Sequence, residues 1–251
     1  MIIHADVLDG IKQIEDNRIH LVLTSPPYNI GIEYTNHSDS LPYGDYLNWL
    51  SRVWAAIIPK MVHGGRICIN IGENKRKDAR IPPYVAISNQ LLSLSLIYRG
   101  TIIWNKNSAA CHTAWGSWRS ASNPHIVPRH EYILCYSKAS MGLEDSGIGG
   151  STMSDEEFMS CTHSVWSIGT AKNDSHPCPY PLELAKRLIN FYTFRGQTIL
   201  DPFAGTGTTG IAAAQLGRSY ILIDNSLAYC RLMQSRLRQN WKVDEILEVN
   251  I

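Results

Sequence analysis

Short runs of consecutive apolar residues recur along the chain and alternate with segments in which apolar residues return every three or four positions. The apolar runs predict seven strands, at 1–5, 19–24, 65–71, 97–104, 131–137, 197–201 and 219–224. The periodic segments predict helices at 45–61, 82–94, 181–192, 207–217 and 226–240. Apolar strands separated by helices are typical of a mostly parallel sheet that is covered on both faces. We therefore expect one doubly wound α/β domain over residues 1–251.

One segment breaks this alternation. Residues 139–164 are rich in glycine, serine and acidic residues and contain few apolar ones. A stretch of this composition has little apolar surface to contribute to a core. We expect a loop or a small insertion here, within the wider interval 139–175.

Composition and charge narrow the class of protein. The chain has 251 residues, a hydrophobic content of 44% and a formal net charge of +1. These values are ordinary for a globular protein, and they leave room for a nucleic-acid partner because a basic face can be balanced by acidic residues elsewhere. No apolar run approaches the ~20 residues that a membrane-spanning helix needs, and no signal-peptide pattern opens the sequence. We expect no membrane partner and a cytoplasmic location.

The cysteines favour free thiols over disulfide bridges or metal. None of the six forms a CxxC pair, and a chain of this length and hydrophobicity does not need disulfide bridges. Cys161, His163, His176 and Cys178 would all have to converge to hold zinc, and neither pair has the usual spacing of a zinc site. We predict no metal site.

The stretch 201-DPFAGTG-207 lies between a predicted strand and a predicted helix. Gly205 and Gly207 permit a tight turn and let a ligand approach the backbone. Asp224 ends the next predicted strand, where an acid commonly accepts hydrogen bonds from ribose hydroxyls. Asp201 could lie near an ammonium group, so a nucleoside with an amino-acid end, such as S-adenosyl-L-methionine, suits this turn. A tight turn without a ligand is the alternative.

The stretch 24-TSPPY-28 directly follows the predicted strand 19–24. Two prolines end a strand and stiffen the backbone beyond its carboxyl end, which is where open α/β sheets bind ligands. Ser25 offers a hydroxyl, the turn offers a rigid carbonyl, and Tyr28 offers a flat aromatic face. Taken alone, the stretch also suits a rigid turn that ends a strand.

Together the two stretches resemble motifs of the amino-methyltransferases of DNA. The first is similar to the FxGxG cofactor motif of that family, and 25-SPPY-28 is similar to its catalytic motif, in which Asp, Asn or Ser precedes Pro-Pro and an aromatic residue. The catalytic motif comes first here, which is the order of the β group of the family. The resemblance covers nearly the whole chain. It implies a Rossmann-like methyltransferase fold with a seven-stranded sheet, and S-adenosyl-L-methionine as the cofactor.

The resemblance also assigns residues to the cofactor. Asp6 would meet the adenine ring, although Asp6 is equally a good N-cap for a helix at 7–13. His176 and Pro177 open the segment that resembles the cofactor-flanking helix of the family. The full implied set is Asp6, Thr24, Asp201, Phe203, Ala204, Gly205, Thr206, Gly207, Asp224, Asn225, His176 and Pro177.

The same resemblance makes Ser25, Pro26, Pro27 and Tyr28 the catalytic residues. Their ligand would be a base flipped out of the duplex, whose exocyclic amine donates to the Ser25 hydroxyl and a Pro26 carbonyl while Tyr28 stacks on the ring. In the family a serine before Pro-Pro-Tyr is associated with N4 of cytosine and an aspartate with N6 of adenine. We expect a site-specific cytosine-N4 methyltransferase, with adenine-N6 specificity as the alternative. A catalytically silent DNA-binding subunit and an RNA or small-molecule methyltransferase are the other interpretations.

Basic and aromatic residues in two connections are candidates for contact with double-stranded DNA. They are Lys75, Arg76, Lys106, Trp115, Trp118, Arg119 and Arg129. A solvated charged turn and a loop pinned by its tryptophans are the alternative interpretations. Because no separate recognition domain is evident, a homodimer could hold the DNA, and a companion restriction endonuclease could accompany the enzyme.

Overall fold

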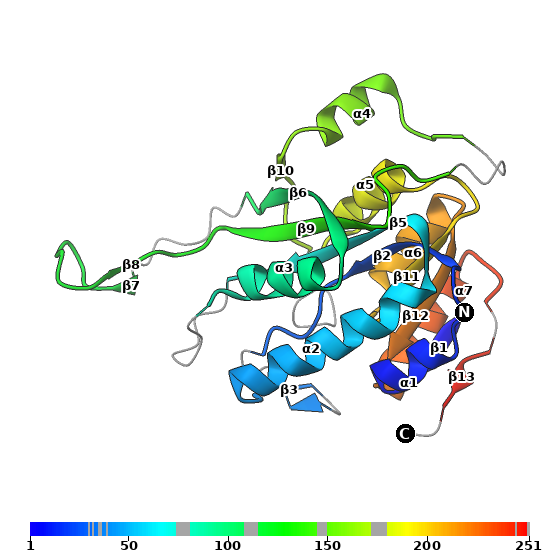
Figure 1. The fold of residues 1–251 in the computed structure, drawn as a ribbon, viewed down its shortest axis with the longest axis horizontal. Coiled ribbons are helices and arrows are strands. Elements are labelled where there is room, and N and C mark those ends of the chain that lie inside the picture. The colour runs from blue at the N-terminus through cyan, green and yellow to red at the C-terminus, as the bar shows by residue number, and fades with distance from the viewer. Residues whose placement is uncertain are drawn as a thin grey trace.

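A computed structural model of the chain describes residues 1–29, 31, 33–34, 37–38, 40–73, 81–107, 115–144, 150–171, 180–243 and 245–249. Its centre is a nine-stranded sheet in the order β10-β6-β9-β5-β2-β11-β12-β1-β13 (Figure 1). The strands are β1 (Ile2–His4), β2 (Ile19–Thr24), β5 (Met61–Ile71), β6 (Leu96–Asn105), β9 (His130–Lys138), β10 (Val165–Ser167), β11 (Thr198–Asp201), β12 (Ser219–Asp224) and β13 (Leu247–Glu248). Only β9 runs antiparallel to its neighbours β5 and β6.

Helices cover both faces of this sheet (Figure 1). The helices are α1 (Val7–Lys12), α2 (Tyr43–Ile57), the 3-10 turn η1 (Ile58–Lys60), α3 (Pro83–Ser93), α4 (Asp155–Cys161), α5 (Leu182–Tyr192), α6 (Thr208–Gln215) and α7 (Leu227–Arg238). Side chains that alternate along β2 divide between the two cores: Val22 packs in the cluster with α1, α2 and α3, and Leu21 and Leu23 pack in the cluster with α5 and α6. Burial on both faces explains why the strands appear as continuous apolar runs.

The predicted doubly wound, mostly parallel sheet is confirmed, and each of the seven predicted strands is present. The expected count of seven is wrong, because β10 and β13 extend the sheet at its two edges. Both are too short to show as an apolar run: β10 has three residues, of which only Trp166 is buried, and both residues of β13 are exposed. Edge strands are held mainly by backbone hydrogen bonds, which leave little mark in the sequence.

The interval 139–175 contains two of these elements, β10 and the helix α4. Helix α4 begins with a capping box in which the Ser154 hydroxyl accepts from the Glu157 N–H and the Glu157 carboxylate accepts from the Ser154 N–H. The acidic first turn of α4 therefore helps to start a helix. Strand β10 pairs with β6 and fastens the segment to the sheet.

Two small hairpins stand outside the main sheet. Strands β3 (Glu33–Tyr34) and β4 (His37–Ser38) pair just after the proline motif. Strands β7 (Trp115–Gly116) and β8 (Pro124–His125) form the end of a long arm between β6 and β9, which projects from the body of the protein (Figure 1). Within the described residues, no helix has both the length and the apolar character needed to cross a membrane.

The strand order brings the two sequence motifs together. Strand β2, which ends in the proline motif, pairs with β11, which ends in the glycine turn, in the register Leu21↔Ile199 and Val22↔Leu200. Strands β12 and β1 follow in the sheet. Because these strands are parallel, their carboxyl ends form one edge, and the loops that leave this edge build a common site.

Candidate active site

A cavity of about 760 Å³, part of it open to solvent, lies at this edge of the sheet. Loops that follow β1, β2, β11 and β12 supply most of its wall, and helices α2 and α7 supply the rest. The lining residues are Ala5, Asp6, Val7, Ser25, Pro27, Trp49, Pro202, Phe203, Gly205, Asp224, Asn225, Ser226 and Tyr229. The size and the mixture of apolar and polar lining suit a small organic ligand.

The glycine turn and Asp224 are joined by backbone hydrogen bonds. The Gly205 N–H donates to Asp224 Oδ2 at 2.8 Å, and the Ser226 N–H donates to Asp224 Oδ1 at 2.9 Å. Burial raises the pKa of Asp224 to about 6, although both N–H donors pull this pKa down. The carboxylate is thus fixed in direction, and it borders the cavity with acceptor capacity left for a ligand.

Gly207 is the N-cap of α6 and has a φ of +82°. A Cβ at this position would lie 2.6 Å from Cβ of Met233 on α7. The backbone therefore requires glycine twice, for its left-handed conformation and for the close approach of α7. This packing sets the turn against the helix that carries Tyr229.

Asp201 is placed differently from the expectation that it borders a ligand. Its side chain is buried and does not line the cavity. Oδ1 accepts from the Thr24 hydroxyl at 2.7 Å and from the Phe203 N–H at 3.1 Å, while Oδ2 accepts from the hydroxyls of Tyr180 and Thr209. Burial raises the pKa of Asp201, and these donors oppose the rise. Asp201 and Thr24 act as an internal brace between β2 and β11.

Asp6 has both of the roles that its position allows. Its Oδ1 accepts from the Leu8 N–H at 2.9 Å, which caps α1 as predicted, and the residue also lines the cavity. Ala204 and Thr206 are buried in the turn and do not line the cavity. Asn225, by contrast, reaches the wall.

The proline motif is held rigidly at the other side of the cavity. The hydroxyl of the buried Tyr46 on α2 donates to the Pro27 carbonyl at 2.8 Å. Pro26 is buried, and Ser25 and Pro27 reach the cavity. Since prolines cannot rotate about φ, this hydrogen bond fixes the turn that presents Ser25.

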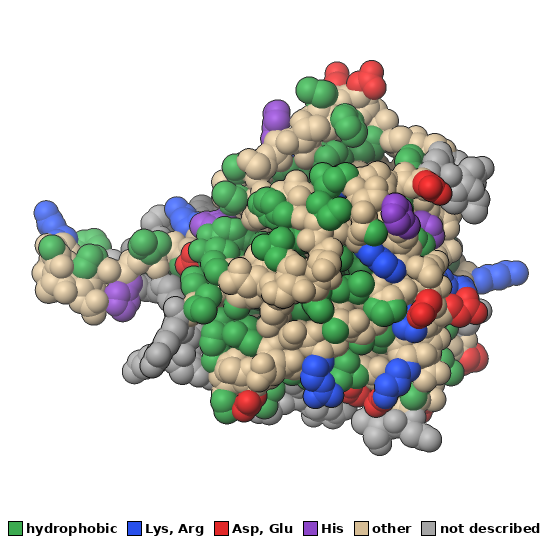
Figure 2. All heavy atoms as spheres, in the orientation of Figure 1, with side chains coloured by type: hydrophobic (Ala, Val, Ile, Leu, Met, Phe, Trp, Pro, Cys, Tyr) green, Lys and Arg blue, Asp and Glu red, His purple; other side chains and the backbone are tan. Residues whose placement is uncertain are grey.

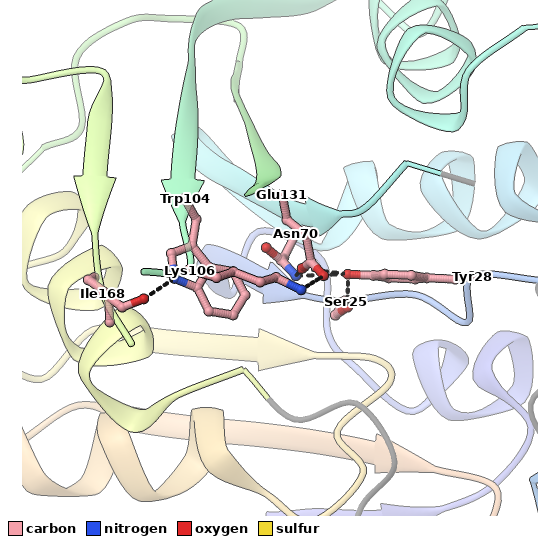
Figure 3. A network of polar contacts seen from close by, with 7 residues as sticks. All are labelled: Ser25, Tyr28, Asn70, Trp104, Lys106, Glu131 and Ile168. Carbon is pink, nitrogen blue, oxygen red and sulfur yellow. Dashed lines mark hydrogen bonds and ion pairs between the residues drawn. The ribbon is translucent and has the colours of Figure 1, made fainter. Parts of the chain in front are cut away.

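Tyr28 belongs to a polar network with residues from three strands (Figure 3). Its hydroxyl accepts from the Ser25 hydroxyl at 3.1 Å and from Asn70 Nδ2 at 2.9 Å, and it donates to Glu131 Oε2 at 3.0 Å. Asn70 Nδ2 also donates to Glu131 Oε2 at 2.7 Å. Lys106 Nζ donates to Glu131 Oε1 at 2.5 Å and lies over the ring of Trp104.

The network assembles at one edge because β9 is antiparallel. Asn70 lies near the end of β5 and Lys106 directly follows β6, whereas Glu131 is near the start of β9. The beginning of β9 therefore meets the ends of its neighbours. Asn70 is 3% exposed, and its Oδ1 has no hydrogen-bond partner among the described residues. A buried acceptor left in this way suits a donor from a ligand.

The predicted DNA contacts lie in different surroundings. Trp118 is 70% exposed near the end of the arm, with the exposed Arg119 beside it and the exposed Arg129 at the arm's return to β9. Trp115 belongs to β7 of the same arm. Residues 107–129 contain no acidic side chain, and Figure 2 shows hydrophobic, basic and histidine side chains on the projecting arm. Lys106 is at the base of the arm and is engaged with Glu131.

Four predicted residues, Lys75, Arg76, His176 and Pro177, lie outside the described residues. Conversely, sequence reasoning missed several residues of the site. Trp49 lines the cavity with its ring 5.6 Å from that of Phe203, and Tyr229 lines it from α7. Both occur inside amphipathic helices, where nothing separates them from core residues. Asn70 and Glu131 were also missed, because their relevance depends on the direction of β9. Ser226 followed the predicted Asp224 and Asn225 closely enough to have been included.

Comparison with known proteins gives this arrangement a family. The family model described as DNA methylase matches residues 19–235. The Type II methyltransferase M.MjaVI of Methanocaldococcus jannaschii is 35% identical over 177 residues, which cover 66% of this chain and 90% of that protein. The Type II methyltransferase M.MthZI of Methanothermobacter thermautotrophicus is 31% identical over 268 residues, which cover 93% of this chain and 75% of that protein.

A solved structure extends the similarity to the fold. The crystal structure of TTHA0409 from Thermus thermophilus, a DNA modification methylase complexed with S-adenosyl-L-methionine, superposes with a TM-score of 0.76. The two chains are 28% identical, and the match covers 99% of each. The nine-stranded sheet and its helices therefore have a counterpart in a methylase of known structure.

Proposed function

This chain belongs to the DNA methylase family, and on that premise we propose that it methylates the exocyclic amine of a base in double-stranded DNA, at N4 of cytosine, with S-adenosyl-L-methionine as the methyl donor. The observation that carries the proposal is that the proline motif and the glycine turn, which lie far apart in the sequence, line one cavity. A methyl donor and an acceptor amine need adjacent sites of this kind.

The residues of the cavity fit the proposed cofactor. The fixed carboxylate of Asp224 can accept hydrogen bonds from ribose hydroxyls, and Gly205 allows close approach of a ligand to the turn. Trp49, Phe203 and Val7 offer apolar surface for a flat ring. Asp6 offers a carboxylate for a purine amine. When bound, S-adenosyl-L-methionine supplies an electrophilic methyl group on a sulfonium centre.

Ser25 and its neighbours orient the amine that receives this methyl group. The Ser25 hydroxyl and the Pro26 carbonyl accept the two N–H bonds of the amine, which draws the nitrogen lone pair out of conjugation with the ring. Tyr28 contacts the base with its ring. Positive charge that develops on the nitrogen is stabilised by the same acceptors. The buried Oδ1 of Asn70 adds acceptor capacity near this position.

The base must leave the duplex to reach such a site, because its amine is otherwise paired. The arm that carries Trp118, Arg119 and Arg129 springs from the strand ends beside the network. We assign it to DNA contact, with Trp118 as a stacking or wedging side chain and the arginines as phosphate partners. A homodimer would place a second arm on the DNA, and the similarity to Type II methyltransferases favours a companion restriction endonuclease.

The choice of cytosine over adenine depends on Ser25. The serine form of the motif is associated with cytosine N4, and adenine N6 is the alternative, since both amines present the same two donors. The chemistry proposed for the cavity is the same for either base. A product analysis therefore separates them.

The direct test is to incubate the protein with S-adenosyl-L-methionine and unmethylated genomic DNA, digest the DNA to nucleosides, and identify the product by mass spectrometry. We expect N4-methylcytosine. N6-methyladenine would correct the base and keep the site and its chemistry. Absence of any methylated nucleoside, with cofactor binding intact by calorimetry, would refute the DNA methyltransferase proposal and favour a silent subunit or an RNA substrate, which competition between duplex DNA and RNA would identify.

The variant Ser25→Ala tests the catalytic assignment. It removes one acceptor of the amine and leaves the Asp224 side of the cavity intact. Turnover should fall by about 100-fold or more, as for other groups that stabilise charge in a transition state, while the cofactor affinity stays within a factor of about two. Turnover equal to that of the wild type would refute the assignment.

A further inference from the structure

A serine hydroxyl is ambiguous in the role proposed for Ser25. It can donate its proton or accept one, whereas an ionised aspartate in the same place can only accept. A hydroxyl that donates to the target amine would occupy the nitrogen lone pair that must attack the methyl group. Ser25 is therefore effective only if its own proton is committed elsewhere. Whether Ser25 meets this condition depends on the direction of its hydrogen bond to Tyr28.

The direction of that hydrogen bond is set at the far end of the network (Figure 3). The ionised carboxylate of Glu131 can only accept, and the positive charge of Lys106, 2.5 Å from Oε1, compensates its charge. Tyr28 must then spend its single proton on Glu131 Oε2, at 3.0 Å. Asn70 Nδ2, which donates to both Tyr28 and Glu131, favours the same direction.

Tyr28 is consequently an acceptor toward Ser25. The Ser25 hydroxyl donates to the Tyr28 oxygen at 3.1 Å, which leaves Ser25 with only lone pairs for a ligand. Each hydrogen bond in such a series polarises the next one in the same direction. The charged end of the network thus fixes the behaviour of a neutral hydroxyl two residues away along the network.

We propose that Glu131 is a positioning residue that makes Ser25 act as a pure hydrogen-bond acceptor for the target amine, with Lys106 as its charge partner. This inference rests on the proposed function and deepens it. It gives a serine motif the same polarity that an aspartate would have by itself. The competing interpretation is that Lys106 and Glu131 only fasten the base of the arm to β9.

The principal test is Glu131→Gln, which keeps the size of the side chain and removes its charge. A glutamine amide can donate to Tyr28 as well as accept, so the direction of the network is no longer imposed. We expect kcat to fall by about 10-fold or more, with KM for DNA and for cofactor changed by less than about 3-fold. The matched control is Glu183→Gln on the exposed first turn of α5, which should leave kcat unchanged.

A double-mutant cycle with Tyr28→Phe separates orientation from fastening. The phenylalanine removes the hydroxyl through which Glu131 acts, so Glu131→Gln should cost nothing further in that background, within about 2-fold. If Glu131 serves only to fasten the arm, its loss should multiply with that of the Tyr28 hydroxyl. Multiplicative losses would overturn the proposal.

A binding measurement tests the same point without turnover. Duplexes that carry the target base, or an analogue with hydrogen in place of its exocyclic amine, are titrated against the protein without cofactor. The wild type should bind the amine-bearing duplex about 2- to 10-fold more tightly, the value of one hydrogen bond, and Glu131→Gln should lose this preference. A preference retained by the variant would refute the role of Glu131.

The outcomes distinguish the two proposals. If the wild type methylates DNA and Glu131→Gln is as fast, only the positioning role fails. If the wild type methylates no DNA, the proposed function fails and takes the positioning role with it. Thermal unfolding of each variant, at a melting temperature close to that of the wild type, establishes that the changes report on the site and not on the fold.

Discussion

The carboxyl of Asp224 gives the cavity a pH dependence that can be measured without DNA. Burial at the end of β12 raises its pKa from an ordinary value of 3.8 to about 6, with the Gly205 and Ser226 N–H groups acting in the opposite direction. Folding therefore makes this carboxyl harder to ionise. The protein keeps the negative charge in place by tertiary packing, at a cost in stability that the cofactor can offset on binding.

The size and sign of this cost follow from linkage. Between the two pKa values the folded state binds more protons than the unfolded state, so the free energy of unfolding decreases as the pH rises. The contribution is fully present below the unfolded pKa and is lost as the pH rises through about 6. The difference between 3.8 and about 6 corresponds to roughly 3 kcal/mol.

The variant Asp224→Asn isolates this contribution, because an amide has no charge to bury. The free energy of unfolding of the variant, relative to the wild type, should rise by up to about 3 kcal/mol between roughly pH 4 and pH 7. Urea unfolding without cofactor measures it at each pH. The exposed variant Asp9→Asn controls for loss of one negative charge near the start of α1. Parallel curves for Asp224→Asn and wild type would show that the carboxyl is not held against ionisation, and would refute the reasoning.

Cofactor affinity should show the opposite pH trend. Ribose hydroxyls donate to an ionised carboxylate, so affinity of the wild type for S-adenosyl-L-methionine should fall as the pH drops below about 6. Asp224→Asn should weaken affinity by about 10- to 100-fold near neutral pH and abolish this pH dependence. Calorimetry at several pH values measures both, and unchanged affinity would remove Asp224 from the cofactor site.

Three further changes test the remaining parts of the site. Gly207→Ala should lower the free energy of unfolding by roughly 2–4 kcal/mol in urea, because its Cβ would meet Met233 in a left-handed turn; Gly44→Ala, which enters open space in α2, should be neutral or stabilising. Asp201→Ala should cost at least about 3 kcal/mol in the same assay, since several buried hydroxyls lose their acceptor, and a loss of cofactor affinity at unchanged stability would contradict the bracing role. Trp118→Ala should change stability by less than about 0.5 kcal/mol yet weaken duplex binding by about 10-fold, as measured by fluorescence anisotropy; unchanged binding would exclude the arm from the DNA interface.

The fold was largely predictable because its strands are buried on both faces. Apolar runs of four residues or more mark them, and the proline motif and glycine turn mark where two of them end. The elements that escaped prediction are the ones with little buried surface. Helix α4 depends on the capping box of Ser154 and Glu157, a local signal that its acidic composition obscured. Strand β10 buries only Trp166.

The candidate site was predictable only in part, for a different reason. Ser25, Gly205 and Asp224 stand directly after strands, so their place at the edge of the sheet followed from the alternation of elements. Trp49 reaches the cavity from a helix that crosses one face, and Glu131 reaches the network because β9 runs in reverse. Such placements depend on strand order and direction, which the spacing of residues in one sequence does not specify.

The pairing of β1 has a consequence for how the protein is made. Ile3 pairs with Ile223 on β12 and with Leu247 on β13, so β1 has no partner in the sheet until almost all of the chain has been synthesised. At ordinary translation rates this delay is on the order of 10–40 seconds. During that time the proline motif is already outside the ribosome, but the wall formed by residues 5–7 has nothing to pack against. A nascent chain therefore cannot use the cofactor as a folding template, and a truncated product should be unable to bind it.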